Sequence, residues 1–245
     1  PLIMAKTKQV IDWVLESIDT SQCNLIFAVR LEHINNYAID DILKEKFGNN
    51  TKIVVVDHDT DGSVSTCMLA KEYIDSDTPL IIYFQPTFDP TTIDDTLDGL
   101  LLTFKANSPA HSYVATDSSG LAIRTAEKEV ISSDAAVGVY YFKHGKYFVN
   151  YAEELIRKDI RTKDEFYICP MYNLLIRDGF KVSIQQIQKM HVLGTPEELE
   201  FFVDKVAYRF GEKPIGLCCD HSGYERKEQA KEILTSLDIE YIDFG

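Results

Sequence analysis

The sequence predicts an α/β protein with a mostly parallel, Rossmann-like sheet and helices on both of its faces. Two observations lead to this prediction. Helical and strand patterns alternate along the first half of the chain with short connections, and such alternation favours parallel strands because each helix returns the chain to the same edge of the sheet. The 245 residues, 45% of them hydrophobic, are enough for one large domain with a small addition.

The individual elements follow from the spacing of apolar residues. Helical spacing predicts helices at residues 6–18, 35–47, 63–74 and 146–160. Apolar or β-branched runs predict strands at residues 24–30, 51–57, 79–85 and 137–145. After residues 94–129 the pattern turns to strands.

The chain is predicted to contain two parts joined by a linker. Residues 1–205 form the large domain, residues 206–213 look like a linker, and residues 214–245 form a separate βαβ unit. The sequence contains no internal repeat and no low-complexity tract. The first residue is Pro1 rather than Met, which suggests that the chain begins inside a longer protein.

The composition argues against several classes of protein. A formal net charge of −14 argues against a nucleic-acid partner, which would need a basic face. No apolar run approaches the ~20 residues of a membrane span, so no membrane insertion is expected and a cytoplasmic protein is predicted. The five cysteines are odd in number and lack zinc-type spacing, so they are predicted to be reduced, mostly buried apolar residues.

Three aspartates at alternate positions, Asp57, Asp59 and Asp61, are followed at once by Gly62. This is how a calcium loop of the EF-hand type begins. The twelfth position of such a loop is Met68, where calcium needs a bidentate glutamate, and the preceding residues form a strand pattern rather than a helix. The sequence therefore disfavours a calcium site.

Two other interpretations of this turn remain. A phosphoesterase with an Asp-His-His motif would need a second histidine at Ser222. Alternatively, Asp57 and Asp59 are solvated charges and Gly62 serves a tight turn into the next helix. A polar, glycine-containing turn between a strand and a helix is also where α/β proteins bind ligands.

Three longer stretches carry a resemblance to a known family: SSGLAIRTAEKEVISSDAAVGVYYFKHG, DEFYICPMYNLLIRDG and KMHVLGTPEELEFF. With them, residues 1–205 resemble the sugar nucleotidyltransferases, which are nucleoside-diphosphate-sugar pyrophosphorylases. The resemblance implies that a nucleoside triphosphate reacts with a sugar 1-phosphate to give a nucleoside-diphosphate sugar and pyrophosphate, as in polysaccharide biosynthesis. A homo-oligomer is also compatible with the resemblance.

The same resemblance assigns the turn after residues 51–57 to the nucleotide. Asp61, Gly62 and Ser63 would form a base-binding turn, with Gly62 and Ser63 contacting the base by close backbone approach. The resemblance also matches Glu127 and Lys128 to the sugar-phosphate pocket. A carboxylate can accept from two sugar hydroxyls and an ammonium can meet a phosphate, whereas the structural alternative is a surface ion pair.

Further matches lie beyond this pair. Val137 and Gly138 match the family strand under the sugar, where a missing side chain leaves room for a ring. Asn173 and Glu165 also match the family pattern, although an asparagine at a helix turn often bonds to the backbone instead.

The magnesium site implied by the resemblance departs from the family pattern. The two positions where relatives carry metal-binding aspartates are Pro86 and Gly194 in this chain. Asp89 is the remaining candidate ligand, provided that the loop is rearranged. The glycine-rich phosphate loop of the family would lie before Pro1. A non-catalytic nucleotide- or sugar-binding domain that has lost its metal site is therefore the alternative to an enzyme.

The final residues, 214–245, resemble the start of the ribose-5-phosphate isomerase B family. In that family an Asp-His turn contacts the sugar phosphate, which corresponds to Asp220 and His221. The chain stops at Gly245, before the catalytic cysteine of that fold. A docked or truncated βαβ unit is the structural alternative.

Overall fold

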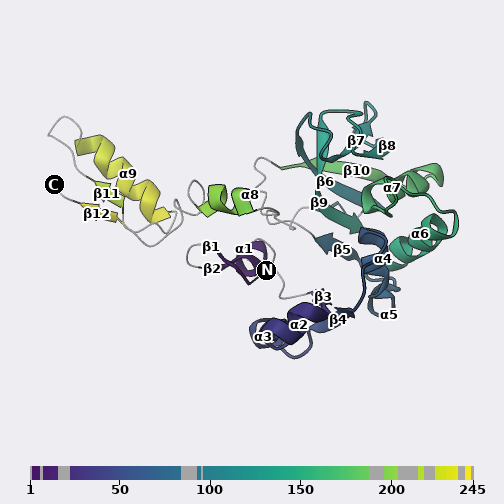
Figure 1. Ribbon diagram of the computed structural model, residues 1–245. Coiled ribbons are helices and arrows are strands. Elements are labelled where there is room, and N and C mark those ends of the chain that lie inside the picture. The colour runs from purple at the N-terminus through teal and green to yellow at the C-terminus, as the bar shows by residue number, and fades with distance from the viewer. Residues whose placement is uncertain are drawn as a thin grey trace. The chain divides into compact units, whose positions relative to one another are not determined.

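The computed structural model divides the chain into two compact units (Figure 1). One unit is Trp13–His191, and the other combines Pro1–Asp12 with Val192–Gly245. The structure describes residues 2–5, 8–15, 23–83, 93–94, 96–187, 196–203, 215–217, 224–236 and 241–243. The predicted linker at residues 206–213 lies outside these ranges.

The larger unit contains a central six-stranded sheet flanked by helices. Its strands are β5 (Leu80–Tyr83), β6 (Gly99–Lys105), β7 (Ser112–Thr116), β8 (Ala122–Glu127), β9 (Asp134–Phe142) and β10 (Val182–Gln186). The order is β10-β6-β9-β7-β8, and β5 pairs with the last part of β9. The prediction of an α/β fold built on a central sheet is confirmed.

The strand directions in this sheet differ from the prediction of mostly parallel pairing. Strand β10 is parallel to β6, but β9 is antiparallel to β5 and β6, and β7 is antiparallel to β8 and β9. The physical reason is that β6, β7, β8 and β9 follow one another through turns. A parallel crossover needs a dozen or more residues, whereas a turn joins antiparallel neighbours.

The first half of the larger unit follows the predicted alternation more closely. Strands β3 (Ile26–Arg30) and β4 (Lys52–Val56) are parallel and form a separate two-stranded sheet. Two helices connect them, α2 (Leu31–Tyr37) and α3 (Ile39–Phe47), because Ala38 has a left-handed backbone that interrupts the predicted helix. The next predicted helix is also divided, into α4 (Ser63–Met68) and α5 (Lys71–Ile74).

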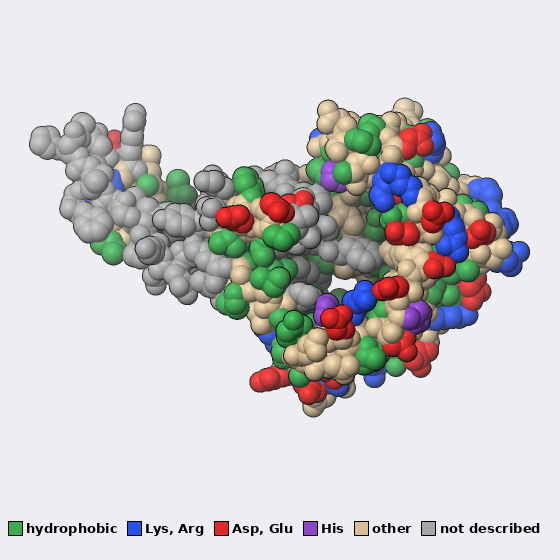
Figure 2. Space-filling view, viewed as in Figure 1, with side chains coloured by type: hydrophobic (Ala, Val, Ile, Leu, Met, Phe, Trp, Pro, Cys, Tyr) green, Lys and Arg blue, Asp and Glu red, His purple; other side chains and the backbone are tan. Residues whose placement is uncertain are grey.

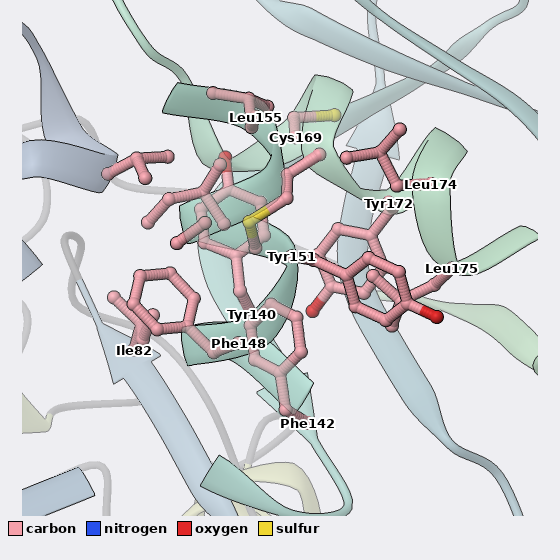
Figure 3. Close-up of a cluster of buried hydrophobic side chains, with 14 of the residues drawn as sticks. Ile82, Tyr140, Phe142, Phe148, Tyr151, Leu155, Cys169, Tyr172, Leu174 and Leu175 are labelled. Atoms are coloured by element: carbon pink, nitrogen blue, oxygen red, sulfur yellow. The ribbon is translucent and has the colours of Figure 1, made fainter. Parts of the chain in front are cut away.

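Alternate side chains of the central sheet face two hydrophobic clusters, as strand geometry requires. Tyr140 and Phe142 of β9 join a cluster with α4, α6 (Gly145–Arg157) and α7 (Ile168–Arg177). Figure 3 shows this cluster, in which the Phe142 ring stacks on Tyr172 at 4.8 Å and meets Phe148 edge-on at 5.5 Å. Val139 and Tyr141 join the second cluster with Leu100 and Leu102. The first cluster fixes α7 and the loop before it against the sheet.

The smaller unit contains a short hairpin and the predicted βαβ unit. Its elements are β1 (Met4–Ala5), β2 (Lys8–Gln9), α8 (Pro196–Phe201), β11 (Ile215–Leu217), α9 (Tyr224–Ser236) and β12 (Tyr241–Asp243). Strands β11 and β12 are parallel, and the ammonium groups of Lys227 and Lys231 contact the Asp243 carboxylate at 2.6 and 3.2 Å. Asp220 and His221 lie outside the described residues. Helix α1 (Val10–Leu15) spans the division between the two units and is shorter than the predicted helix at residues 6–18.

None of the helices in the described part of the chain has the length and apolar character needed to cross a membrane. Figure 2 shows basic and acidic side chains interspersed over the larger unit.

Gly145, the first residue of α6, provides a test of this packing. A Cβ at Gly145 would lie 1.9 Å from the carbonyl oxygen of Ile74, so Gly145→Ala should lower the free energy of unfolding by about 1–3 kcal/mol. Lys146→Ala is the neighbouring control, because the Lys146 ion pair with Asp77 is exposed and such pairs contribute little. Urea denaturation of the three proteins checks this, and equal midpoints would contradict the proposed overlap.

Candidate functional site

The turn between β4 and α4 holds the three alternating aspartates. Each carboxylate contacts a different basic side chain: His58 at 2.6 Å for Asp57, Arg30 at 3.1 Å for Asp59, and Arg161 at 3.1 Å for Asp61. The three carboxylates therefore serve separate contacts. Within the described ranges, no group of three or more His, Cys, Asp and Glu side chains is placed to hold a metal ion.

Gly62 of this turn packs against the backbone of Phe166. It has φ 106° and ψ −176°, a backbone conformation that is essentially restricted to glycine. A Cβ would lie 2.7 Å from the Phe166 oxygen and 2.8 Å from its nitrogen. The missing side chain thus makes room for the protein's own backbone, a contact that the base-binding interpretation did not anticipate.

Hydrogen bonds lock this contact on both sides of Gly62. The Phe166 N–H donates to the Asp61 carbonyl at 2.7 Å, and the Val64 N–H donates to the Phe166 carbonyl at 3.0 Å. The Ser63 hydroxyl also points to the Phe166 carbonyl, at 3.4 Å. The roles of Asp61, Gly62 and Ser63 in base binding stay a prediction, and the geometry fixes the shape of their turn.

Glu127 is the last residue of β8 and is half-buried. Its carboxylate accepts a hydrogen bond from the hydroxyl of Ser112, the residue of β7 that lies opposite Glu127 in the sheet. Burial raises the pKa of the Glu127 carboxyl above its ordinary value, and this effect outweighs the opposing Ser112 hydrogen bond and the nearby Lys128 charge. The carboxylate is thus placed in a partly dry environment, where hydrogen bonds to a charged group are strengthened.

Lys128 follows in a left-handed conformation with φ 56°. Its ammonium donates to the Tyr167 hydroxyl at 2.7 Å and lies 4.8 Å from the centre of the Tyr167 ring. The hydrogen bond to Tyr167 raises the pKa of Lys128. Among the described residues, no carboxylate forms an ion pair with Lys128 within 4.0 Å, so its direct partner is a neutral phenol.

Consecutive residues connect the two predicted halves of the site. Phe166 lies on the turn at Gly62, and the next residue, Tyr167, holds Lys128. Glu165 precedes them and is close enough for its charge to raise the pKa of Glu127. Residues of both the predicted nucleotide turn and the predicted sugar-phosphate pair therefore contact one short segment, Glu165–Tyr167.

Three other predicted residues lie in packed positions. Val137 is buried in the second cluster. Gly138 has φ 85°, at the point where residues 137–139 of β9 face a single residue of β6. The Asn173 side-chain amide bonds twice to the Thr125 backbone of β8, accepting from its N–H and donating to its carbonyl, each at 2.8 Å. Asn173 thus fastens α7 to an edge strand, and its sugar-binding role stays a prediction.

Three residues of this region were not predicted: Ser112, Arg161 and Tyr167. Strand register places Ser112 opposite Glu127, so a correct pairing of β7 with β8 would have found it. Tyr167 directly follows the matched Glu165 in the chain. The contact of Arg161 with Asp61 spans 100 residues and has no local signal.

The expected magnesium ligand Asp89 lies outside the described residues, as do Pro86 and Gly194. The described residues supply no metal-binding cluster, so they do not by themselves fit a magnesium ion. Magnesium remains an expectation from the family resemblance.

Two solved structures share the fold of this chain. A nucleoside-diphosphate-sugar pyrophosphorylase from Vibrio cholerae RC9 aligns with a TM-score of 0.72 and 20% identity, over 83% of this chain and 91% of that protein. A protein from Bacillus anthracis assigned as a glucose-1-phosphate thymidylyltransferase, solved with a sucrose, aligns with a TM-score of 0.64 and 15% identity, over 86% and 87%. The chain thus resembles the sugar nucleotidyltransferases in fold. No protein-family model and no curated protein matches it.

The Gly62 contact predicts a large effect of a single methyl group. Gly62→Ala should lower the free energy of unfolding by about 2 kcal/mol or more, because backbone strain and overlap with Phe166 act together. Ser63→Ala, which removes only a long hydrogen bond, should cost less than about 1 kcal/mol. Urea denaturation compares the two, and a Gly62→Ala protein as stable as Ser63→Ala would refute the contact.

Glu127 predicts a defined pH dependence of stability. Its folded-state pKa is raised above the ordinary 4.5, so the protonated form is favoured in the fold. The resulting stability is fully present below pH 4.5 and is lost as the pH rises through the raised pKa. The unfolding free energy of the parent should therefore fall relative to Glu127→Gln between about pH 4 and pH 7. Denaturant titrations across this range check it, and a difference that is constant or grows with pH would contradict it.

Proposed function

We propose that the chain is a sugar-1-phosphate nucleotidyltransferase. A phosphate oxygen of the sugar 1-phosphate attacks the α-phosphorus of a nucleoside triphosphate, the bond to the β-phosphate breaks, and pyrophosphate leaves. The observation that supports this proposal is the junction at Glu165–Tyr167, because it brings the turn at Gly62 and the Glu127–Lys128 pair to one segment. The fold shared with sugar nucleotidyltransferases is consistent with it.

The residues suit the two ends of such a ligand. Lys128 carries a positive charge whose direct partner is neutral, so the charge remains available to a sugar phosphate. Glu127 can accept hydrogen bonds from sugar hydroxyls, and charge-assisted hydrogen bonds are stronger than neutral ones. The turn Asp61–Ser63 would hold the base beside the backbone of Phe166.

A non-catalytic nucleotide- or sugar-binding domain is the second candidate. Its support is the sequence at Pro86 and Gly194, where the related family carries metal-binding aspartates. Phosphoryl transfer depends on positioning and on neutralisation of charge, so the loss of both carboxylates would spare binding and remove turnover. We assign no step of the reaction to magnesium.

One experiment separates these candidates. The protein is titrated by calorimetry with a panel of nucleoside-diphosphate sugars, and pyrophosphate release is measured from each nucleoside triphosphate with a panel of sugar 1-phosphates and Mg²⁺. Binding with turnover supports the enzyme. Binding without turnover supports the second candidate, and the absence of both would overturn the two proposals together.

Lys128→Ala tests the sugar-phosphate assignment. It should weaken binding of a nucleoside-diphosphate sugar by about tenfold or more, because ~1.5–3 kcal/mol of charge-assisted hydrogen bonding is lost. The melting temperature should change little, since an ion pair or a hydrogen bond of an exposed side chain contributes at most ~1 kcal/mol to the free energy of unfolding.

Lys105→Ala is the matched control. Its ammonium pairs with the Asp134 carboxylate at 2.7 Å on the same sheet, so its charge is already engaged and affinity should equal that of the parent. Equal affinities of the parent and the Lys128→Ala protein, with clear binding to the parent, would remove Lys128 from the site.

A further inference from the structure

We propose that Arg161 is a positioning residue, which holds the segment Glu165–Tyr167 on the turn at Asp61 and thereby fixes the place of the Lys128 ammonium. The effect on ligand binding rests on the proposed function. The effect on the position of Lys128 is a property of the protein alone.

The Arg161 guanidinium contacts four other residues of the protein. Its Nε donates to the Asp159 carboxylate at 2.5 Å, Nη1 to the Asp164 carbonyl at 2.8 Å, and Nη2 to the Asp61 carboxylate at 3.1 Å. The guanidinium carbon lies 4.0 Å from the centre of the Phe166 ring. One planar group therefore ties together both ends of the loop before α7 and the turn after β4, and the rigid fork of arginine suits this geometry.

The contacts pass from Arg161 to Lys128 in two steps. The ring of Phe166 lies against the guanidinium, and its backbone lies in the space beside Gly62. The next residue, Tyr167, accepts the hydrogen bond from Lys128. The Arg161 guanidinium is thus linked to the Lys128 ammonium through two consecutive residues, Phe166 and Tyr167.

Left-handed backbone conformations are concentrated in this region, at the end of α6 and in the turn that hydrogen bonds between Thr162 and Glu165 close. Five non-glycine residues in the described chain have positive φ, and three of them, Asp159, Lys163 and Asp164, are in this loop. A fourth is Lys128 itself. Such conformations persist when surrounding contacts impose them, and they cluster at functional sites. Arg161 adds a direct contact to two of these three loop residues, Asp159 and Asp164.

The proposal predicts a local effect rather than a large loss of stability. The Arg161 and Asp61 side chains are 32% and 62% exposed, and exposed ion pairs contribute little to global stability. If Arg161 served only the stability of the loop, its removal would change neither the reactivity of Lys128 nor the affinity for the ligand.

A ligand-free experiment tests the position of Lys128. The protein is treated with a limiting amount of an amine-acylating reagent, and the labelling rate of each lysine is followed by peptide mass spectrometry, with Lys105 as internal reference. Tyr167→Phe removes the hydrogen bond to the Lys128 ammonium and should accelerate its labelling, and Arg161→Ala should accelerate it as well, because it releases the segment that carries Tyr167. Arg177→Ala is the matched control.

Arg177 suits this purpose because it also bonds two carboxylates, those of Glu154 and Asp178, at the other end of α7. Its removal should leave the labelling rate of Lys128 unchanged. If Arg161→Ala also leaves that rate at the parent value while Tyr167→Phe raises it, the positioning role of Arg161 is overturned.

Binding provides the second test. Affinity for a nucleoside-diphosphate sugar should fall about fivefold to tenfold in Arg161→Ala, yet change much less when Lys128→Ala is already present, because the proposed effect of Arg161 on binding acts through Lys128. Arg161→Lys keeps the charge but loses the fork, so it should behave as Arg161→Ala.

The outcomes separate the two proposals. Additive losses in the double variant, or parent-like affinity of Arg161→Lys, would show that Arg161 acts through charge alone and would overturn positioning. If the parent binds no nucleoside-diphosphate sugar, the proposed function fails, and the labelling result still decides whether Arg161 positions Lys128.

Discussion

The close contact between Gly62 and the backbone of Phe166 is the constraint on which the candidate site depends. No other residue type combines the required backbone conformation with the 2.7 Å approach to the Phe166 oxygen. The contact joins the turn after β4 to the loop before α7, two segments far apart in the sequence. The two-stranded sheet of β3 and β4 is separate from the six-stranded sheet, and this junction links the turn Asp61–Ser63 to the segment that also contacts Lys128.

The junction is anchored in the hydrophobic core through Phe166. Phe166 is 2% exposed and belongs to the same cluster as Tyr172 of α7 and Phe142 of β9. The Tyr172 hydroxyl donates to the Tyr141 carbonyl at 2.8 Å, and the Asn173 amide bonds to Thr125. Helix α7 is therefore fastened to two strands of the sheet. The loop before α7 ends at this helix, so its last residue, Tyr167, is held in a defined position.

The strand directions show which part of the fold the sequence could predict. The alternation over residues 24–85 gave the parallel pair β3 and β4, because helices separate them. The antiparallel pairs from β6 to β9 were also within reach, since no helical pattern interrupts residues 99–142 and strands joined by turns pair antiparallel. The error came from extending the alternation of the first half to the whole sheet.

The site was predictable where its residues are close in sequence. Glu127 and Lys128 are adjacent, and the turn Asp61–Ser63 follows a clear strand, so the family resemblance could assign each from a short stretch of sequence; their roles stay a prediction. The contacts that link each of them to the loop before α7 depend on tertiary structure: the Arg161 to Asp61 pair spans 100 residues and the Lys128 to Tyr167 bond spans 39. Periodicity and spacing carry no information about such pairs, because neither residue type is unusual at its own position.

The two cations near the junction differ in how far their charge is compensated. Arg161 directly contacts the carboxylates of Asp61 and Asp159, so its charge serves the loop. Lys128 contacts a phenol hydroxyl and an aromatic ring, which orient an ammonium without neutralising it. A chain with a net charge of −14 repels anionic ligands at long range, so binding a sugar phosphate requires a local cation that is not directly bonded to a carboxylate. The arrangement of Tyr167 under Lys128 meets this requirement while keeping the ammonium in one place.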